Sequence, residues 1–156
     1  MDNVKIERLH SNQEIPYDLL LLADESLEAI HKYLSVSDIY IARHVASGNP
    51  LAVFVLQSLN RKEMEIKNIA VSPEFQDIGI GSCMIEEIKQ IARSQGCSAI
   101  WVGTPDSAFL QICFYKKNGF SIATVKKDFY VQNYPYPIFE NDVELKDMIM
   151  LTAKIE

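Results

Sequence analysis

The segment Gln76-Asp77-Ile78-Gly79-Ile80-Gly81 stands between a strand-like run, Met64 to Val71, and a long amphipathic helical pattern. Two glycines let the backbone pass close to a ligand while its amide N–H groups converge. A helix that begins at this point adds a partial positive charge at its first turn. The segment therefore predicts an anion cradle suited to phosphate.

Paired glycines before a helix also occur in nucleotide-binding folds and in simple turns. A dinucleotide-binding fold would place a third glycine at position 84, where the chain has Met84. A P-loop would place Lys followed by Ser or Thr after its last glycine, but Ser82 and Cys83 stand there. A simple turn that enters a helix is the remaining alternative, and the surrounding sequence decides against it.

The helical pattern after the glycines has one buried face, formed by Met84, Ile85, Ile88, Ile91 and Ala92, and Gly96 is a natural C-terminal cap. Before it, the patterns predict a strand at 4–9, helical segments at 17–23 and 25–34, and a hairpin of strands at 38–45 and 51–59. After it, they predict a strand at 99–103, a nearly all-apolar helix at 108–118, a strand from 119 to 131, an aromatic loop at 134–141 and a final strand at 145–153.

This order predicts an α/β fold in which a mixed sheet is flanked by helices. Residues 1–156 contain no repeat, linker or low-complexity tract, so we expect one domain.

The formal net charge of −6 argues against a nucleic-acid partner. No signal peptide or apolar run long enough to cross a bilayer is present, so we expect no membrane partner and a cytoplasmic location. Three cysteines and three histidines are scattered, which disfavours a metal site or a histidine-based triad.

Two further stretches agree with the glycine segment in order and register. The strand Glu65-Ile66-Lys67-Asn68-Ile69-Ala70-Val71 is followed by Ser72-Pro73, and Phe114-Tyr115-Lys116-Lys117-Asn118-Gly119-Phe120 follows later. Together the three segments resemble the GNAT superfamily of N-acetyltransferases, whose Tyr-x-Lys-x-Gly-Phe pattern the last stretch matches. The resemblance implies a twisted, mostly antiparallel sheet with splayed central strands.

The resemblance also implies acetyl-CoA as the cosubstrate. Its pyrophosphate would lie on the backbone of the loop, formed by Gln76, Asp77, Ile78, Gly79, Ile80, Gly81 and Ser82, with Lys117 near the phosphates. Free backbone groups of Ile69, Ala70 and Val71 would bind the pantetheine arm as a sheet edge binds a peptide. Many relatives have a basic or glycine residue where this chain has Asp77, and often Lys or Arg where it has Ser82. An acidic side chain beside a pyrophosphate is unfavourable unless it points to solvent.

For catalysis, the resemblance implies direct attack of an amine on the thioester without a metal. Glu65 matches the position of the base that several relatives use, and Tyr115 matches the tyrosine that protonates the departing thiolate. Because an alkyl ammonium has a pKa of about 10, it needs a base at neutral pH. We therefore expect a primary amine of a small molecule, or of a peptide, as the acceptor.

The aromatic and acidic segment near the C-terminus suggests where such an amine would bind. Tyr134 and Glu140 are the candidates, because carboxylates and aromatic faces attract ammonium groups. A packed surface loop or a subunit contact is the alternative, and the resemblance allows a homodimer. Two other functions stay open at this point: a non-catalytic acyl-CoA-binding sensor or subunit with the same fold, and a structural domain that binds no coenzyme.

Overall fold

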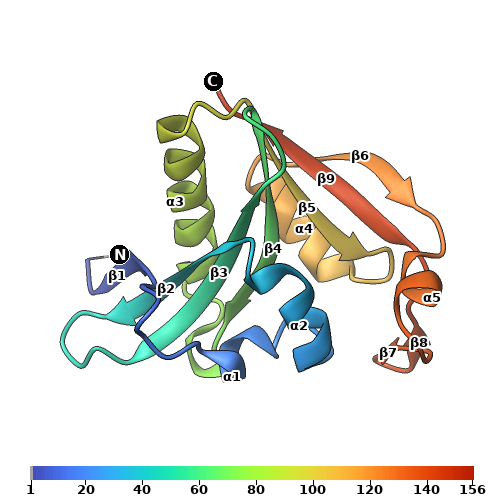
Figure 1. Ribbon diagram of the computed structural model, residues 1–156, viewed down its shortest axis with the longest axis horizontal. Helices are drawn as coiled ribbons and strands as arrows, with labels where there is room; N and C mark the ends of the chain where they lie inside the picture. Colours follow the sequence, from blue (N-terminus) through green and yellow to red (C-terminus); the bar gives the residue numbers. More distant parts are fainter. Residues whose placement is uncertain (1) are drawn as a thin grey trace.

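The computed structural model describes residues 2–156 and contains a seven-stranded sheet with helices on both faces (Figure 1). The strand order across the sheet is β1 (Val4–Arg8), β2 (Asp38–His44), β3 (Pro50–Ser58), β4 (Glu63–Val71), β5 (Ala99–Pro105), β9 (Met148–Lys154) and β6 (Ser121–Lys126). Neighbouring strands are antiparallel except for β4 and β5, which are parallel. The predicted mixed, mostly antiparallel sheet is confirmed. That the chain is one domain stays a prediction.

Each face of the sheet has its own hydrophobic core. One core contains the buried side of α3 (Ile80–Ser94) together with Tyr115 of α4 (Phe109–Lys117). The other contains α1 (Tyr17–Leu20) and α2 (Leu27–Leu34), packed on β2, β3 and the end of β4. Ser26 caps α2 by accepting a hydrogen bond from the Ala29 N–H at 3.1 Å. These contacts fix the two helical layers on either side of the central strands.

β4 carries an irregularity at the point where it leaves β5. Its pairing with β3 shifts register, because Val55 pairs with Asn68 whereas Leu56 pairs with Ile66. Lys67 is therefore an extra residue, a bulge that bends the strand. β4 pairs with β5 only as far as Ile66 and Val102, although both strands continue. The two strands diverge from there, which confirms the predicted splay (Figure 1).

The C-terminal third differs from the prediction in one element. The strand expected from 119 to 131 ends at Lys126, and α5 (Phe129–Asn133) occupies its last residues. The chain turns at Asp128, which has a positive φ of 54° and whose N–H donates to Asp147 Oδ1 at 2.8 Å. The prediction was wrong because the apolar residues after Asp128 belong to a helix, and a hydrogen bond from a distant part of the chain holds the turn that separates them from the strand.

The aromatic loop also contains a small hairpin that the sequence did not predict. It consists of β7 (Phe139–Glu140) and β8 (Val143–Glu144), joined by Asn141 and Asp142. Both turn residues have positive φ angles, 51° and 65°, which suit a tight hairpin turn.

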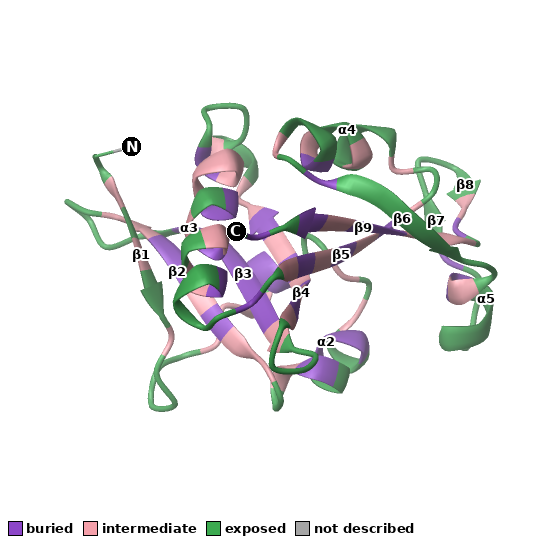
Figure 2. Cartoon of the chain, turned by 90° about the horizontal axis from the view of Figure 1, so that it is seen from above, coloured by how far each residue is buried: buried purple, intermediate pink, exposed green. Residues whose placement is uncertain are grey.

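The apolar helix α4 is largely exposed rather than buried. Figure 2 shows that β6 and most of α4 lie on the surface, whereas the central strands and the inner side of α3 are buried. Phe109 is 72% exposed, and Tyr115 is the one residue of α4 that is buried. The position of Tyr115 next to the splayed strands thus follows from packing of this single side chain.

Candidate active site

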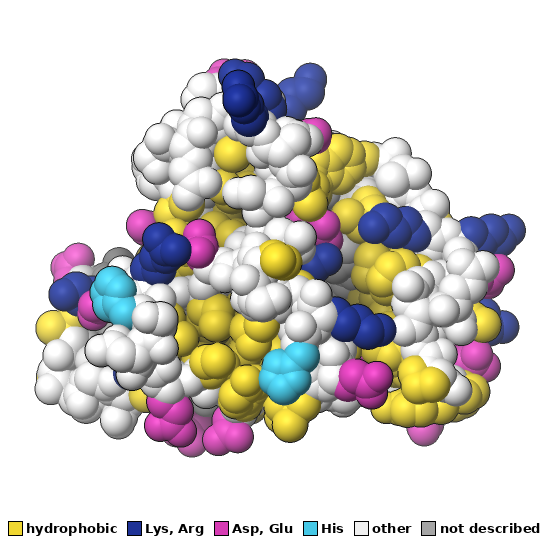
Figure 3. All heavy atoms as spheres, in the orientation of Figure 1, with side chains coloured by type: hydrophobic (Ala, Val, Ile, Leu, Met, Phe, Trp, Pro, Cys, Tyr) yellow, Lys and Arg dark blue, Asp and Glu magenta, His cyan; other side chains and the backbone are white. Residues whose placement is uncertain are grey.

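A cavity of about 540 Å³ opens where β4 and β5 separate. Both strands line it, together with the segment between α1 and α2, the inner side of α4 and the segment from α5 to β9. On the face in Figure 3, a hollow with hydrophobic side chains lies between the regions of α2 and α5, and both acidic and basic side chains border it. The splay therefore creates a groove of ligand size.

The edge of β4 that faces this cavity has free backbone groups. The Ser72 N–H donates to the Leu51 carbonyl of the β3 side at 2.8 Å. Alternate residues of an antiparallel strand direct their backbone groups towards opposite neighbours. Ile69 and Val71 therefore direct theirs towards the open side, where β5 no longer pairs. There, Gln76 Nε2 donates to the Val71 carbonyl at 3.0 Å and ties the glycine loop to the strand.

The loop itself presents a row of amide N–H groups. Asp77 and Gly79 have positive φ angles of 63° and 94°, and Gly79 precedes α3 without a side-chain cap. Among the described residues, no N–H from position 77 to position 82 has a backbone or side-chain acceptor. The first N–H after them, that of Cys83, donates to the Gly79 carbonyl at 3.0 Å. Unpaired donors at a helix start suit an anion, so this backbone fits a pyrophosphate.

Tyr115 lines the cavity from α4 and is almost fully buried. Its ring makes edge contacts with Phe114 and Phe120, at centroid distances of 5.3 Å and 5.7 Å. Burial raises the pKa of the Tyr115 hydroxyl above its ordinary value. The hydroxyl therefore stays protonated at neutral pH, as a proton donor must.

The structure brings together some predicted site residues and separates others. The large cavity is lined by Ile69, Ala70, Val71, Gln76, Tyr115, Tyr134 and Glu140. The rest of the predicted set does not line it: Glu65, Asp77, Ile78, Gly79, Ile80, Gly81, Ser82 and Lys117. The loop residues among these adjoin the cavity through Gln76, whereas Lys117 lies at the far end of α4.

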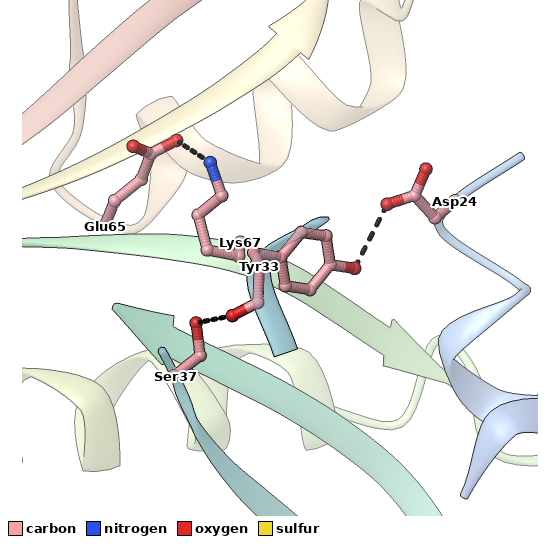
Figure 4. Close-up of polar contacts among 5 residues, drawn as sticks. All are labelled: Asp24, Tyr33, Ser37, Glu65 and Lys67. Carbon is pink, nitrogen blue, oxygen red and sulfur yellow. Dashed lines mark hydrogen bonds and ion pairs between the residues drawn. The ribbon is translucent and has the colours of Figure 1, made fainter. Parts of the chain in front are cut away.

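Glu65 occupies a different environment from the one expected of a free base. It lines a second pocket of about 230 Å³ and not the large cavity. Its carboxylate lies 3.3 Å from Lys67 Nζ (Figure 4), and neither side chain is more than 28% exposed. Its role as the base stays a prediction.

Carboxylates and tyrosines gather at one end of the large cavity. Asp24, Glu25 and Glu140 line it there, with Tyr130 and Tyr134 stacked at 5.9 Å between ring centroids. Burial, with the charges of Asp24 and Glu25, raises the pKa of Tyr134 to about 12. Burial, with Glu140 and Asp24, also raises the pKa of the Glu25 carboxyl. The negative charges are thus close enough to oppose one another, and a cation would relieve that repulsion.

A hydrogen-bond chain that the sequence did not reveal runs from β4 to Asp24. Asn68 Nδ2 donates to the Tyr33 hydroxyl at 3.1 Å and to the Leu20 carbonyl at 2.9 Å. The Tyr33 hydroxyl donates to Asp24 Oδ2 at 3.0 Å (Figure 4). Asn68 is 4% exposed, and its Oδ1 has no partner among residues 2–156. The sequence contains one sign of Asp24, which is that it separates the two helical segments predicted at 17–23 and 25–34.

Acidic, histidine and cysteine side chains do not converge on a metal position. In the part of the chain that the structure describes, no group of three or more His, Cys, Asp or Glu side chains is placed to hold a metal ion. None of the helices within residues 2–156 combines the length and the apolar character that a membrane crossing requires.

The chain is similar to known acetyltransferases in sequence. Residues 35–122 match the family model described as an acetyltransferase (GNAT) domain. The uncharacterized N-acetyltransferase YvbK of Bacillus subtilis is 35% identical over 152 residues, which cover 97% of this chain and 96% of YvbK.

Two solved structures with bound coenzyme are similar over nearly the whole chain. A GNAT family acetyltransferase from Elizabethkingia anophelis with acetyl-CoA bound has a TM-score of 0.94 and 38% identity, and the match covers 99% of this chain and 100% of that one. An acetyltransferase from Bacillus subtilis in complex with CoA has a TM-score of 0.87 and 33% identity, with coverage of 98% and 99%.

Proposed function

Because this chain belongs to the GNAT acetyltransferase family, we propose that it transfers the acetyl group of acetyl-CoA to a primary amine of a small cationic molecule. The observation that carries the proposal is the groove between β4 and β5, which is lined by the buried Tyr115 and by Gln76, the residue next to the unpaired N–H groups of the loop. Coenzyme in two similar solved structures supports it.

In this proposal the chain holds the coenzyme mostly through its backbone. The N–H groups from Asp77 to Ser82 receive the pyrophosphate, and the open edge at Ile69 and Val71 binds the pantetheine arm. The backbone donors would carry this contact, because Asp77 and Ser82 supply no positive charge. Asp77 is exposed, so its carboxylate can avoid the phosphates. Lys117 stays a candidate for a phosphate contact.

Acetyl-CoA supplies an activated thioester, and the side chains of the protein move the protons. Tyr115 is the proposed donor to the departing sulfur, because its buried hydroxyl lines the groove and keeps its proton at neutral pH. Tyr134 and Glu140 are proposed to hold the cationic part of the acceptor, because both line the acidic and aromatic end of the cavity. An amine of a peptide is the second class of acceptor.

A panel of acceptors tests the proposal. The protein is mixed with acetyl-CoA and with polyamines, amino sugars, amino acids or peptides, while release of the free CoA thiol is followed. We expect amine-dependent release that is fastest with acceptors that carry a second cation. Release no faster than background hydrolysis with every acceptor, although acetyl-CoA binds, would contradict transfer and favour the non-catalytic sensor or subunit.

A further inference from the structure

We propose that Asp24, rather than Glu65, binds the ammonium group of the acceptor and takes its proton, and that Tyr33 and Asn68 position Asp24 for this role. The inference rests on the proposed function, since it names the base of that same site. Asp24 and Glu65 both lie near the splayed strands, but they have different neighbours, and only Asp24 faces the large cavity.

Asp24 faces the groove in which the coenzyme would lie. It lines the large cavity together with Ile69, Val71 and Tyr115, and it also lines the smaller pocket next to it. Glu65 lines only the smaller pocket, and its carboxylate is paired with Lys67 at 3.3 Å. A carboxylate already paired with a lysine is a poor base, because the lysine charge favours its ionised form. Of the two, Asp24 has access to the groove, and within residues 2–156 it forms no ion pair with a lysine at 4.0 Å or less.

Two neutral donors hold the Asp24 carboxylate in a fixed orientation. The Glu25 N–H donates to Oδ1 at 2.9 Å, and the Tyr33 hydroxyl donates to Oδ2 at 3.0 Å. Asn68 in turn donates to the Tyr33 hydroxyl at 3.1 Å, so the hydroxyl hydrogen is directed at Asp24 and not elsewhere. Each carboxylate oxygen can accept a further hydrogen bond. An ammonium group in the cavity can provide it.

Burial makes the Asp24 carboxyl a better proton acceptor, and the groups that face it oppose this effect only in part. Burial raises the pKa of the Asp24 carboxyl although the two hydrogen bonds and the charges of Lys67 and Lys32 oppose the shift. The remaining titratable groups at this end of the cavity are Glu25, Tyr33, Tyr130, Tyr134 and Glu140. Two of them are carboxylates, so this end of the cavity attracts a cation before Asp24 deprotonates it.

The proton balance of the step is complete without another reactant. Asp24 takes one proton from the acceptor ammonium, and the freed lone pair forms the C–N bond to the acetyl carbon as the C–S bond breaks. Tyr115 gives a proton to the sulfur and regains one from the acceptor nitrogen. Asp24 returns its proton to solvent, so the products are the acetamide, the CoA thiol and one released proton.

The kinetic test compares two acceptors that differ in basicity. Propylamine is almost wholly protonated at neutral pH, whereas 2,2,2-trifluoroethylamine is largely neutral because its fluorine atoms withdraw electrons. For Asp24→Asn we expect kcat/KM with propylamine to fall about 100-fold or more, with a smaller loss for trifluoroethylamine. The loss with propylamine should shrink as the pH approaches the pKa of the amine. Tyr33→Phe should show a smaller loss with the same dependence on the acceptor.

Three comparisons keep this test decisive. Asp18→Asn removes an exposed carboxylate of α1 and should leave kinetics and acetyl-CoA binding unchanged. Binding of acetyl-CoA to Asp24→Asn at the native affinity shows that the variant is folded. Equal losses with both acceptors, or a loss confined to Glu65→Gln, would overturn the role of Asp24. Native coenzyme binding without acetylation of either acceptor by the unsubstituted protein would contradict the proposed function instead.

A second measurement needs no coenzyme. The side-chain carboxyl ¹³C resonance of Asp24, assigned by its absence in Asp24→Asn, should shift saturably with added propylamine hydrochloride. An unchanged resonance would overturn the inference even if the protein acetylates amines. Failure to bind acetyl-CoA, with a normal shift of this resonance, would contradict the proposed function instead.

Discussion

Gly81 in the first turn of α3 lies against the ring of Phe114 in α4. A Cβ atom at position 81 would be 3.0 Å from Phe114 Cζ and 3.1 Å from Cε1. Such contacts are shorter than ordinary van der Waals separations, so glycine here lets the helix that follows the loop approach the helix that carries Tyr115. The glycine was expected to make room for phosphate, and the structure adds a packing reason.

This contact predicts that Gly81→Ala and Phe114→Leu are coupled. Gly81→Ala should lower the free energy of unfolding by about 1–3 kcal/mol because it overpacks the contact. In the Phe114→Leu background the same change should cost clearly less, because the smaller side chain leaves room for the methyl group. Thermal unfolding of the two single variants and the double variant measures the coupling. Strictly additive effects would show that the two residues do not press on each other.

Gly79 is the opposite case. There is space for a side chain at this position, but the backbone conformation disfavours one. It has a φ of 94°, and within residues 2–156 no atom outside its chain neighbours would lie within 4 Å of a Cβ at this position. Gly79→Ala should therefore cost about 1–2 kcal/mol from backbone strain alone, and Gly79→Asn less. Gly79→Ala should also weaken acetyl-CoA binding, because the turn at Gly79 sets the orientation of the loop N–H groups.

Gly48 is the matched control for Gly79. It has a φ of 73° and equally open surroundings, but lies in the turn between β2 and β3. Gly48→Ala should reduce stability similarly and leave the acetyl-CoA dissociation constant unchanged. A loss of affinity in both variants would mean that strain, and not the geometry of the loop, controls binding.

Tyr115→Phe should lower turnover by about 100-fold or more and leave coenzyme affinity close to the native value. The hydroxyl is needed only when the sulfur departs, whereas the ring keeps its contacts with Phe114 and Phe120. Steady-state kinetics and calorimetric titration separate the two effects. Tyr40→Phe removes a hydroxyl outside the cavity and is the control. Equal losses of turnover and affinity would assign Tyr115 a packing role.

The raised pKa of Asp24 has a consequence for stability that can be measured without substrate. In the folded chain burial raises this pKa above 3.8, so the folded state binds the proton more tightly than the unfolded state. The carboxyl therefore favours folding at low pH, and this contribution is lost as the pH rises through the folded pKa. Asp24→Asn should stabilise the protein at neutral pH, and the gain should vanish as the pH falls towards 3.8.

Chemical denaturation across this pH range measures the effect. Asp18→Asn, at an exposed position of α1, should show no such dependence. A destabilised Asp24→Asn at neutral pH would mean that its hydrogen bonds outweigh the cost of burying its charge.

Local patterns predicted most of the fold, because most of its elements carry their own signals. The apolar stripe of α3 and the left-handed Gly96 that follows its last turn were both expected and are both found. The predicted hairpin corresponds to β2 and β3, whose turn contains Gly48. The end of β6 was missed because Asp128 is held by Asp147, a partner 19 residues away.

The candidate site was predicted less completely for the same physical reason. Loop and tyrosine segments carry a readable order, so Gln76, Tyr115 and the edge of β4 were expected together, and the structure places them around one cavity. The proposed role of Asp24 depends on Tyr33 and on Asn68, which is 48 residues from the Leu20 carbonyl that anchors it. Glu65 and Lys67 lie two residues apart on one strand, so their side chains share a face and their ion pair is compatible with the sequence pattern alone.

Calorimetric titration with acetyl-CoA, combined with thermal unfolding, tests most directly whether the groove between β4 and β5 is a coenzyme site. We predict saturable binding at one site and, at about 100 times the dissociation constant, a stabilisation of about 2.7 kcal/mol. Gly79→Ala should weaken both signals, and Gly48→Ala should leave the binding heat unchanged. No heat of binding and an unchanged melting temperature at millimolar acetyl-CoA would contradict the account.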